Sequence, residues 1–300
     1  MNNLSVIILT YNEELNLDRC LNSLIPLNAD IYIIDSFSND KTLEIAKKYN
    51  CNILQNKFIN HSNQINWAIN NINFNSEWIL RLDSDEYITV ELLDELKNRL
   101  SLVPEKFSGI FLKRRVYFLE KWIRFGGYYP TRLLRIWRNG HALCEERMMD
   151  EHIKLIRGDS FQFNNDFIDY NLKNLHWWIN KHNNYATKEA IEYIKYKYDL
   201  SMDNEIKSKF FGTQEKRKRW FKKNIYNSMP LFFRSFIYFF YRYFIRFGFL
   251  DGIRGLIFHF LQGFWYRFLV DVKIYEILKK SKKNKDLMIE IIKSQYNIKL

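Results

Sequence analysis

Residues 78–86 read Trp-Ile-Leu-Arg-Leu-Asp-Ser-Asp-Glu, an apolar run that ends in two closely spaced carboxylates. On a β-strand, the i, i+2 spacing of Asp83 and Asp85 would place both side chains on the same side. Carboxylates so close repel each other unless a cation lies between them. Oxygen ligands favour hard divalent ions such as Mg²⁺ or Mn²⁺. The pattern therefore indicates a metal site, although a solvated turn after a strand has the same local sequence.

Two similar apolar runs lie upstream of this one. Residues 4–9 are mostly β-branched, and residues 31–34 lead into Asp35. Both runs are typical of buried parallel strands. Helical patterns separate the runs, at residues 17–24, at residues 41–49 and in a segment that Ser62 can cap. This alternation predicts a parallel α/β sheet.

Polar side chains gather where the predicted strands end. Ligands of parallel α/β sheets bind beyond the carboxyl ends of the strands. Four side chains fall at those ends, namely Tyr11, Asp35, Asp83 and Asp85. Their convergence predicts a ligand site at this edge of the sheet.

The segments at these strand ends resemble those of family-2 glycosyltransferases. The matching residues are Thr10-Tyr11-Asn12-Glu13, Asp35, Asp40 and Asp83-Ser84-Asp85. The resemblance extends over roughly residues 4–200 and implies the GT-A fold, a Rossmann-like, mostly parallel α/β sheet with flanking helices. It also implies a nucleotide-diphosphate sugar as donor and inversion of the anomeric centre.

The resemblance also assigns roles within the donor site. It implies that Tyr11 and Asp35 hold the base, and that Asp83 and Asp85 handle the ribose, the diphosphate and the metal. Residues 61–68 look like the helix that faces the nucleotide sugar in bacterial lipopolysaccharide-core β-glucosyltransferases. The expected nucleotide-sugar-binding residues are Thr10, Tyr11, Asn12, Glu13, Asp35, Gln64, Asp83 and Ser84. Because a carboxylate can accept a hydrogen bond from the imide N–H of uracil, we expect a UDP-sugar.

An inverting transferase needs a base that deprotonates the acceptor hydroxyl. The acidic cluster at residues 145–152 is the obvious source. In the resembling enzymes a His-Glu pair occupies this place. By register Glu151 matches the glutamate, and Asp150 stands where the histidine would be. We expect Glu151 to be the base and keep Asp150 as the second candidate; a solvated acidic loop is the remaining alternative.

Three further residues are weaker candidates. His176 precedes two tryptophans and could be a third metal ligand beside Asp83 and Asp85, or a packed residue of the core. Arg132 and Arg135 lie on a predicted strand. They could meet phosphate on donor or acceptor, or pair with the acidic loop that follows.

The net charge of +12 is unevenly distributed along the 300 residues. Residues 1–206 hold 25 Lys and Arg against 28 Asp and Glu, a net charge of −3. Residues 207–300 hold 21 against 6, a net charge of +15. We therefore expect a catalytic domain at 1–206 and a basic, aromatic, helical membrane-association region at 207–300.

The aromatic stretches of the C-terminal region, residues 229–247 and 250–275, are interrupted by arginines and do not read as transmembrane helices. At 100° per residue, Arg234, Arg242 and Arg246 fall within one sector of a helix. Arginines on one side and aromatics on the other suit the interface of an anionic bilayer. A buried helical subdomain is the main alternative. Single-stranded nucleic acid is disfavoured, because the aromatic run is too continuously apolar.

Residue 4 already begins the first predicted strand, so the sequence suggests no signal peptide. The three cysteines have no metal or disulfide spacing, which suits a reduced cytoplasm. Together these features predict a metal-dependent inverting glycosyltransferase at the cytoplasmic face of a bacterial inner membrane, bound peripherally. The expected acceptor is a lipid-linked glycan or the lipopolysaccharide core.

Two other functions share some of these sequence features. A nucleotidyltransferase would share the sheet and the acidic metal site, but it usually carries a Gly-rich, basic loop after the first strand. Residues 10–14, Thr-Tyr-Asn-Glu-Glu, are acidic instead. A non-catalytic membrane-associated binding protein is disfavoured by the complete set of carboxylates.

Overall fold

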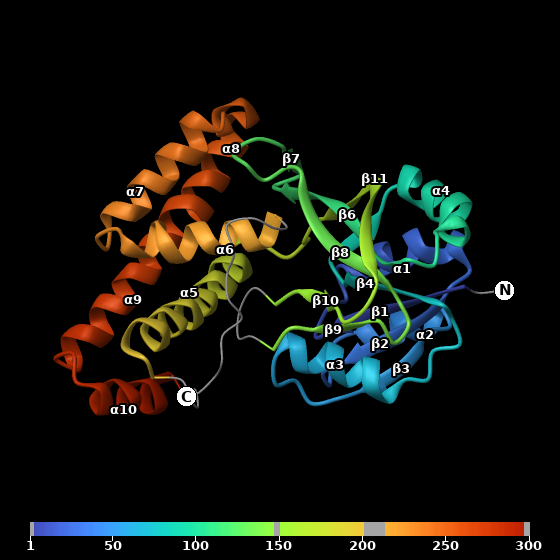
Figure 1. Ribbon diagram of the computed structural model, residues 1–300, viewed down its shortest axis with the longest axis horizontal. Helices are drawn as coiled ribbons and strands as arrows, with labels where there is room; N and C mark the ends of the chain where they lie inside the picture. Colours follow the sequence, from blue (N-terminus) through green and yellow to red (C-terminus); the bar gives the residue numbers. More distant parts are fainter. Residues whose placement is uncertain (1–2, 147–150, 201–213, 297–300) are drawn as a thin grey trace. The chain divides into compact units, whose positions relative to one another are not determined.

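The computed structural model of the protein describes residues 3–146, 151–200 and 214–296. The chain divides into two compact units (Figure 1). The first, here called the sheet unit, comprises Met1–Arg124 and Tyr128–Lys173. The second, here called the helical unit, comprises Phe125–Gly127 and Asn174–Leu300.

This division lies earlier in the chain than the boundary predicted between residues 206 and 207. The prediction rested on the change in charge. In the structure, α5 (Leu175–Tyr198) packs against α9 (Tyr266–Lys280). Ala190 and Ile194 of α5 share a buried cluster with Ile274 of α9. Because α5 packs against the C-terminal helices, the helical unit already includes the chain from Asn174 onward. The change in net charge comes later in the sequence, near residue 206.

The sheet unit begins with alternating strands and helices, as predicted. Its first elements are β1 (Leu4–Thr10), α1 (Leu17–Leu24), η1 (Ile25–Leu27), β2 (Asp30–Asp35), α2 (Thr42–Lys48), β3 (Asn52–Gln55), α3 (His61–Asn71) and β4 (Trp78–Asp83). Asn60 caps α3, because its side chain accepts a hydrogen bond from the Asn63 N–H. The expected cap, Ser62, instead lies inside the first turn of that helix.

The rest of the sheet unit is richer in strands. Its elements are β5 (Glu86–Ile88), α4 (Val90–Arg99), η2 (Leu100–Leu102), β6 (Phe107–Phe118), β7 (Lys121–Ile123), β8 (Thr131–Arg138), β9 (Ala142–Cys144), β10 (Ile153–Leu155) and β11 (Asp159–Asp169). β9 and β10 form a small antiparallel pair.

One nine-stranded sheet has the order β3-β2-β1-β4-β8-β6-β11-β5, with β7 paired to β6. Strands β1 to β4 pair in parallel, and so do β6 and β11. Strand β8 runs antiparallel to its neighbours β4 and β6, and β5 runs antiparallel to β11. The predicted α/β class with a GT-A-type sheet is confirmed.

Strand β1 is buried on both faces, which explains its unbroken apolar sequence. Val6 and Ile8 belong to one core cluster of the sheet unit, and Ile7 belongs to the other. All three side chains are fully buried. Because successive residues of a strand point to opposite faces, one strand anchors both layers of the core.

The helical unit is rich in aromatic residues, as predicted. After α5 its described elements are α6 (Gln214–Asn224), η3 (Tyr226–Ser228), α7 (Phe233–Phe240), η4 (Tyr241–Ile245), η5 (Gly248–Asp251), α8 (Gly252–Phe258), η6 (His259–Trp265), α9 and α10 (Lys285–Tyr296). None of the helices within the described residues combines the length and the apolar composition needed to cross a bilayer.

The arginines expected to face a membrane mostly face the inside of the helical unit. Arg234 is 1% exposed, and its Nε donates to Asp271 Oδ1 at 2.8 Å. Arg242 is 3% exposed, and its Nε donates to the Gly126 carbonyl at 3.0 Å. The expected sector exists for these two residues but points inward, because groups far along the chain accept their hydrogen bonds: the Asp271 carboxylate for Arg234, and the Gly126 carbonyl for Arg242. Only the third of the three, Arg246, is exposed.

Candidate functional site

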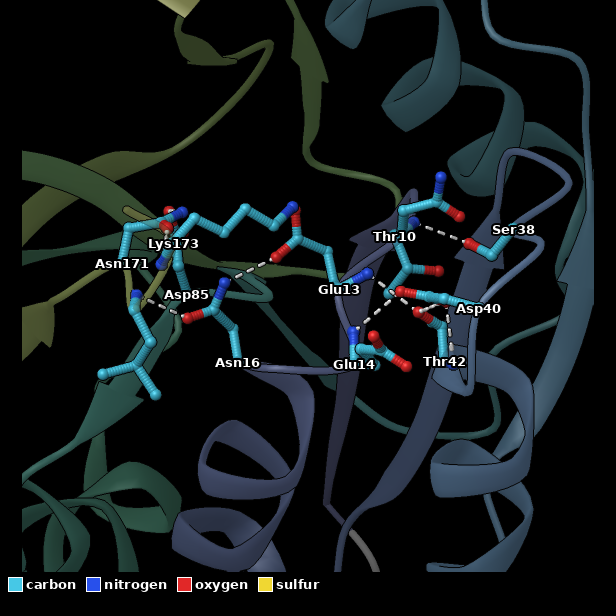
Figure 2. A network of polar contacts seen from close by, with 12 residues as sticks. Thr10, Glu13, Glu14, Asn16, Ser38, Asp40, Thr42, Asp85, Asn171 and Lys173 are labelled. Carbon is cyan, nitrogen blue, oxygen red and sulfur yellow. Dashed lines mark hydrogen bonds and ion pairs between the residues drawn. The ribbon is translucent and has the colours of Figure 1, made fainter. Parts of the chain in front are cut away.

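The turn after β1 is bonded to the turn after β2 (Figure 2). Asn12 has a positive φ of 54°, a conformation that asparagine tolerates. Its N–H donates to Ser38 Oγ at 2.9 Å, and its Oδ1 accepts from the Asn39 N–H at 2.9 Å. The Glu13 N–H donates to Thr42 Oγ1 at 2.8 Å. The motif at residues 10–13 therefore lies on a loop whose main chain is held in place.

Asp35 is fully buried behind these turns. Its carboxylate accepts hydrogen bonds from Thr10 Oγ1 at 3.0 Å, the Ser38 N–H at 2.9 Å and Gln55 Nε2 at 3.2 Å. A carboxylate with several internal donors orders the turn that supplies them. In the structure, Asp35 orders the turn after β2. Its contact with the nucleotide base stays a prediction.

Gln64 is also buried. Its Nε2 donates to Ser36 Oγ at 3.1 Å and to the Asn56 carbonyl at 3.0 Å, and its Oε1 accepts from Asn56 Nδ2 at 2.8 Å. The side chain thus ties α3 to the segments after β2 and β3. Tyr11, by contrast, is 58% exposed and presents its ring to solvent.

The two carboxylates of the opening motif lie at the end of β4. The strand ends at Asp83, so Asp85 lies in a turn and the expected same-side placement on one strand does not apply. The Asp83 side chain is 35% exposed, and Arg81 Nη2 lies 3.2 Å from its Oδ1. Asp85 is partly exposed, and its Oδ2 accepts from Asn171 Nδ2 at 2.8 Å. Ser84, between them, is buried.

The loop after β11 connects the carboxylate turn with the loop after β1 (Figure 2). Lys173 Nζ lies 2.7 Å from Glu13 Oε1. The Lys173 N–H donates to Asn171 Oδ1 at 2.8 Å, and Asn171 in turn donates to Asp85. A chain of contacts therefore runs from Glu13 to Asp85. Neither Asn171 nor Lys173 was predicted from the sequence, because they follow their partners by 86 and 160 residues and no local pattern marks them.

Glu86, which directly follows Asp85, is a third residue of the site that was not predicted from the sequence. It is 1% exposed; its Oε2 accepts from the Asp83 N–H at 2.9 Å, and its Oε1 lies 2.5 Å from Arg135 Nη2. Burial raises the pKa of Glu86 to about 8, although Arg135 lowers it. The signal that could have identified Glu86 was its position at the start of a short strand, β5. In the structure, the charged side chain at this position is enclosed.

Arg135 also lies 3.6 Å from Asp83 Oδ2, so one guanidinium meets two carboxylates of the turn. The other arginine of the pair, Arg132, donates through Nε to Gln162 Oε1 at 2.5 Å. Both arginines thus contact side chains of the sheet unit, and their contact with phosphate stays a prediction.

We expect Glu86→Gln to change how stability depends on pH. The raised pKa means that the folded protein holds this proton more firmly than the unfolded chain. The stabilising contribution is therefore fully present below about pH 4 and is lost as the pH rises toward about 8, by at most about 1.4 kcal/mol per unit. Urea unfolding of both proteins at several pH values in this range measures the difference. A wild-type stability that rises with pH relative to the variant would contradict it.

Glu151 lies near enough to the carboxylate turn to act on the same groups. Burial lowers the pKa of Arg81, but the negative charges of Asp83, Glu86 and Glu151 outweigh that effect and raise it. Burial raises the pKa of the Cys144 thiol to about 12, and Glu151 and Asp83 add to the rise. The predicted base and the predicted metal ligand thus share one electrostatic environment. The second candidate base, Asp150, lies outside the described residues.

His176 lies in the first turn of α5, in the helical unit, and is exposed. Its Nε2 lies 3.0 Å from Asn180 Nδ2. Because the side chain is exposed, His176 is not the packed core residue that was the alternative prediction. Within the described part of the chain, no group of three or more His, Cys, Asp or Glu side chains is arranged to hold an ion. The ligand set of Asp83, Asp85 and His176 stays a prediction.

The fold and the strand-end motifs define an α/β protein of the GT-A type. Residues 5–148 match the family model described as Glycosyl transferase family 2, and this segment therefore belongs to that family. The resemblance seen in the strand-end motifs is confirmed; its lipopolysaccharide-core subgroup stays a prediction.

Curated relatives match part of the chain. An uncharacterized glycosyltransferase of Rickettsia typhi is 29% identical over 97 residues, which are 32% of this chain and 32% of the relative. The poly(ribitol-phosphate) beta-N-acetylglucosaminyltransferase TarS of Staphylococcus aureus is 28% identical over 129 residues, 36% of this chain and 20% of TarS. The match thus spans about a third of the length of the first relative. The crystal structure of S. aureus TarS 1-349 aligns with 98% of this chain and 91% of its own, at 16% identity and a TM-score of 0.43.

Proposed function

We propose that the protein is an inverting, metal-dependent glycosyltransferase. It moves a hexose-type sugar from a nucleotide-diphosphate sugar, a UDP-sugar, to a lipid-linked glycan or lipopolysaccharide-core acceptor. The match of residues 5–148 to the family model Glycosyl transferase family 2 supports sugar transfer as the class of reaction. The name of the relative TarS, a beta-N-acetylglucosaminyltransferase, supports transfer of a hexose-type sugar.

One observation carries the proposal: the two carboxylates that suit a metal, Asp83 and Asp85, lie at the end of β4, inside the segment that matches the family model. Asp83 and Glu151 both raise the pKa of Arg81 against the effect of burial. Displacement of a nucleoside diphosphate requires compensation of the charge that develops on its phosphates, together with a base for the acceptor hydroxyl. We assign the first requirement to Asp83 and Asp85, and the second to Glu151.

The residues present fit a divalent ion. Asp83 and Asp85 offer carboxylate oxygens at a partly exposed turn. Mg²⁺ is commonly held by one or two carboxylates together with substrate phosphates and water, so two protein ligands suffice. When bound, Mg²⁺ or Mn²⁺ would compensate the negative charge of the departing diphosphate.

The chain's own groups do the remaining work in this mechanism. Glu151 accepts the proton of the acceptor hydroxyl as that oxygen attacks the anomeric carbon. The attack comes from the face opposite the diphosphate and therefore inverts the centre. Tyr11 stacks on the base, and the link from Glu13 through Lys173 and Asn171 holds the loop after β1 and the carboxylate turn together. Arg81 and Arg135 stay beside Asp83, where they add positive charge.

The identity of the donor is tested by calorimetry with UDP, GDP and CMP in the presence of Mg²⁺. We expect UDP to bind tightest and Tyr11→Ala to weaken its binding by about 10-fold, the effect of one lost stacking contact. Tyr49→Ala, which removes a ring outside the site, is the matched control. Tightest binding of GDP would overturn the uridine assignment and leave the transferase class untouched.

The class of reaction is tested by product analysis with a panel of UDP-sugars. Slow hydrolysis that releases UDP, and that stops in excess chelator, is expected without acceptor. Formation of a nucleotide sugar from a sugar phosphate and a nucleoside triphosphate would instead establish the nucleotidyltransferase. Failure to bind or hydrolyse any nucleotide sugar would favour the non-catalytic binding protein.

A further inference from the structure

Large apolar side chains of η4, η5 and α8 are exposed in the helical unit. We define the apolar patch as Phe244, Ile245, Phe247, Leu250 and Ile253, whose exposed fractions run from 47% to 69%. Segment η5 packs against both η4 and α8, so the patch residues lie on neighbouring segments. Soluble proteins seldom expose clustered apolar side chains of this size unless the surface meets a partner or a membrane.

The charge around the patch has one sign. Residues 241–258, which form η4, η5 and α8, contain three arginines and one acidic residue, Asp251. Asp251 is 2% exposed and accepts a hydrogen bond from the Phe125 N–H at 2.9 Å, so its charge is enclosed. Arg246 and Arg254, within the same segments as the patch, are exposed. The surface therefore combines apolar side chains with cations that no exposed acidic residue of this stretch balances.

We propose that this patch binds the interface of an anionic lipid bilayer. Apolar side chains would enter the boundary between headgroups and acyl chains, and Arg246 and Arg254 would meet lipid phosphates. A second copy of the chain is a poorer occupant, because a two-fold interface brings the same patch against itself and therefore sets like charges together. This mode differs from the one expected from the sequence, because Arg234 and Arg242 are buried and cannot reach lipid.

The patch is held on a fixed frame. The segment Phe125–Gly127, from the connection between β7 and β8, is part of the helical unit. Its Gly126 N–H donates to the Arg246 carbonyl at 2.9 Å, and its carbonyl accepts from Arg242. A Cβ added at Gly248 would lie 2.7 Å from the buried ring of His259, so η5 packs closely on η6. A preorganised patch loses less conformational freedom on binding than a flexible tail would.

The test is sedimentation of the full-length protein with vesicles. One set contains equal parts of phosphatidylglycerol and phosphatidylcholine, and the other contains phosphatidylcholine alone. Wild type should bind the anionic vesicles more tightly, and salt should weaken that binding only in part. The double variant Ile245→Ser/Ile253→Ser should bind at least about 10-fold more weakly, because two large apolar side chains no longer enter the interface.

A matched control separates the patch from exposed apolar residues in general. Val90 and Leu102, in the sheet unit, are 71% and 75% exposed, and Val90→Ser/Leu102→Ser should bind like wild type. Arg246→Gln/Arg254→Gln should weaken binding to anionic vesicles by about 10-fold or more and leave binding to neutral vesicles nearly unchanged. Circular dichroism checks that each variant keeps its helices.

Three results would overturn the proposal. Wild type could ignore both kinds of vesicle, or the patch variant could bind as well as the control variant. The protein could also form a dimer in solution that the patch variant abolishes, which would make the patch a subunit interface. Vesicle binding requires no nucleotide sugar, so these outcomes are independent of the proposed activity.

Discussion

Replacement of Asp85 by Asn is expected to remove most transfer activity while the fold survives. Asp85 is partly exposed in the turn after β4, and its Oδ2 accepts one hydrogen bond, from Asn171. An asparagine oxygen can accept the same bond, so the turn should keep its shape. The variant lacks the negative charge that would help hold a divalent ion at the diphosphate. We expect a loss of roughly 10²–10³-fold, the effect of one lost electrostatic contact to a transition state.

The measurement is the rate of transfer or donor hydrolysis at saturating UDP-sugar, with and without added Mg²⁺. Asp94→Asn removes the same charge from an exposed position on α4 and should leave the rate unchanged. Both variants should unfold at nearly the wild-type temperature. Full activity of Asp85→Asn, or wild-type activity in excess chelator, would show that the carboxylate turn holds no catalytic metal.

Replacement of Glu151 by Gln should separate donor binding from transfer. Glutamine keeps the size of the side chain but cannot accept the proton of the acceptor hydroxyl. Donor binding, measured by calorimetry with UDP, should stay unchanged, and transfer should fall by roughly 10²–10⁴-fold. Activity should not recover at higher pH, since the amide has no ionised form. Glu145→Gln is a comparison within the same loop, since Glu145 pairs with Lys154 at 2.6 Å.

A parallel Asp150→Asn variant decides between the two carboxylates. If Asp150→Asn is inactive and Glu151→Gln transfers normally, the base is Asp150. If both variants transfer normally, the base lies outside the acidic loop. Reduced donor binding in Glu151→Gln would instead give Glu151 a part in holding the donor.

Much of the sheet unit could be predicted from the sequence, because its signals are local. The apolar runs that end at Thr10, Asp35 and Asp83 are the strands β1, β2 and β4. A strand buried on both faces needs an unbroken apolar run, and such a run can be recognised directly in the sequence. The strand-end motifs likewise sufficed to recognise the family of residues 5–148.

The roles of single polar residues were harder to predict from the sequence. Asp35 and Gln64 stand in the motif of the resemblance, yet the structure buries both and pairs them with the chain itself. Whether a polar side chain faces a ligand or the interior depends on the neighbours that folding supplies. Those neighbours, such as Asn56 for Gln64, are not marked by any periodic pattern.

By itself, therefore, the sequence determined the strands β1, β2 and β4, the carboxylates at their ends, the family of residues 5–148, and the aromatic and basic character of the C-terminal region. Only the tertiary structure decided which charges are enclosed and which meet solvent. Arg234 is buried because Asp271, 37 residues further on, lies within hydrogen-bonding distance of it. Asp85 is linked to Glu13 only through the distant residues Asn171 and Lys173. Helical and strand periodicity in the sequence indicate which residues lie on the same face of an element. Burial of a charge depends instead on a partner that only the folded chain brings close.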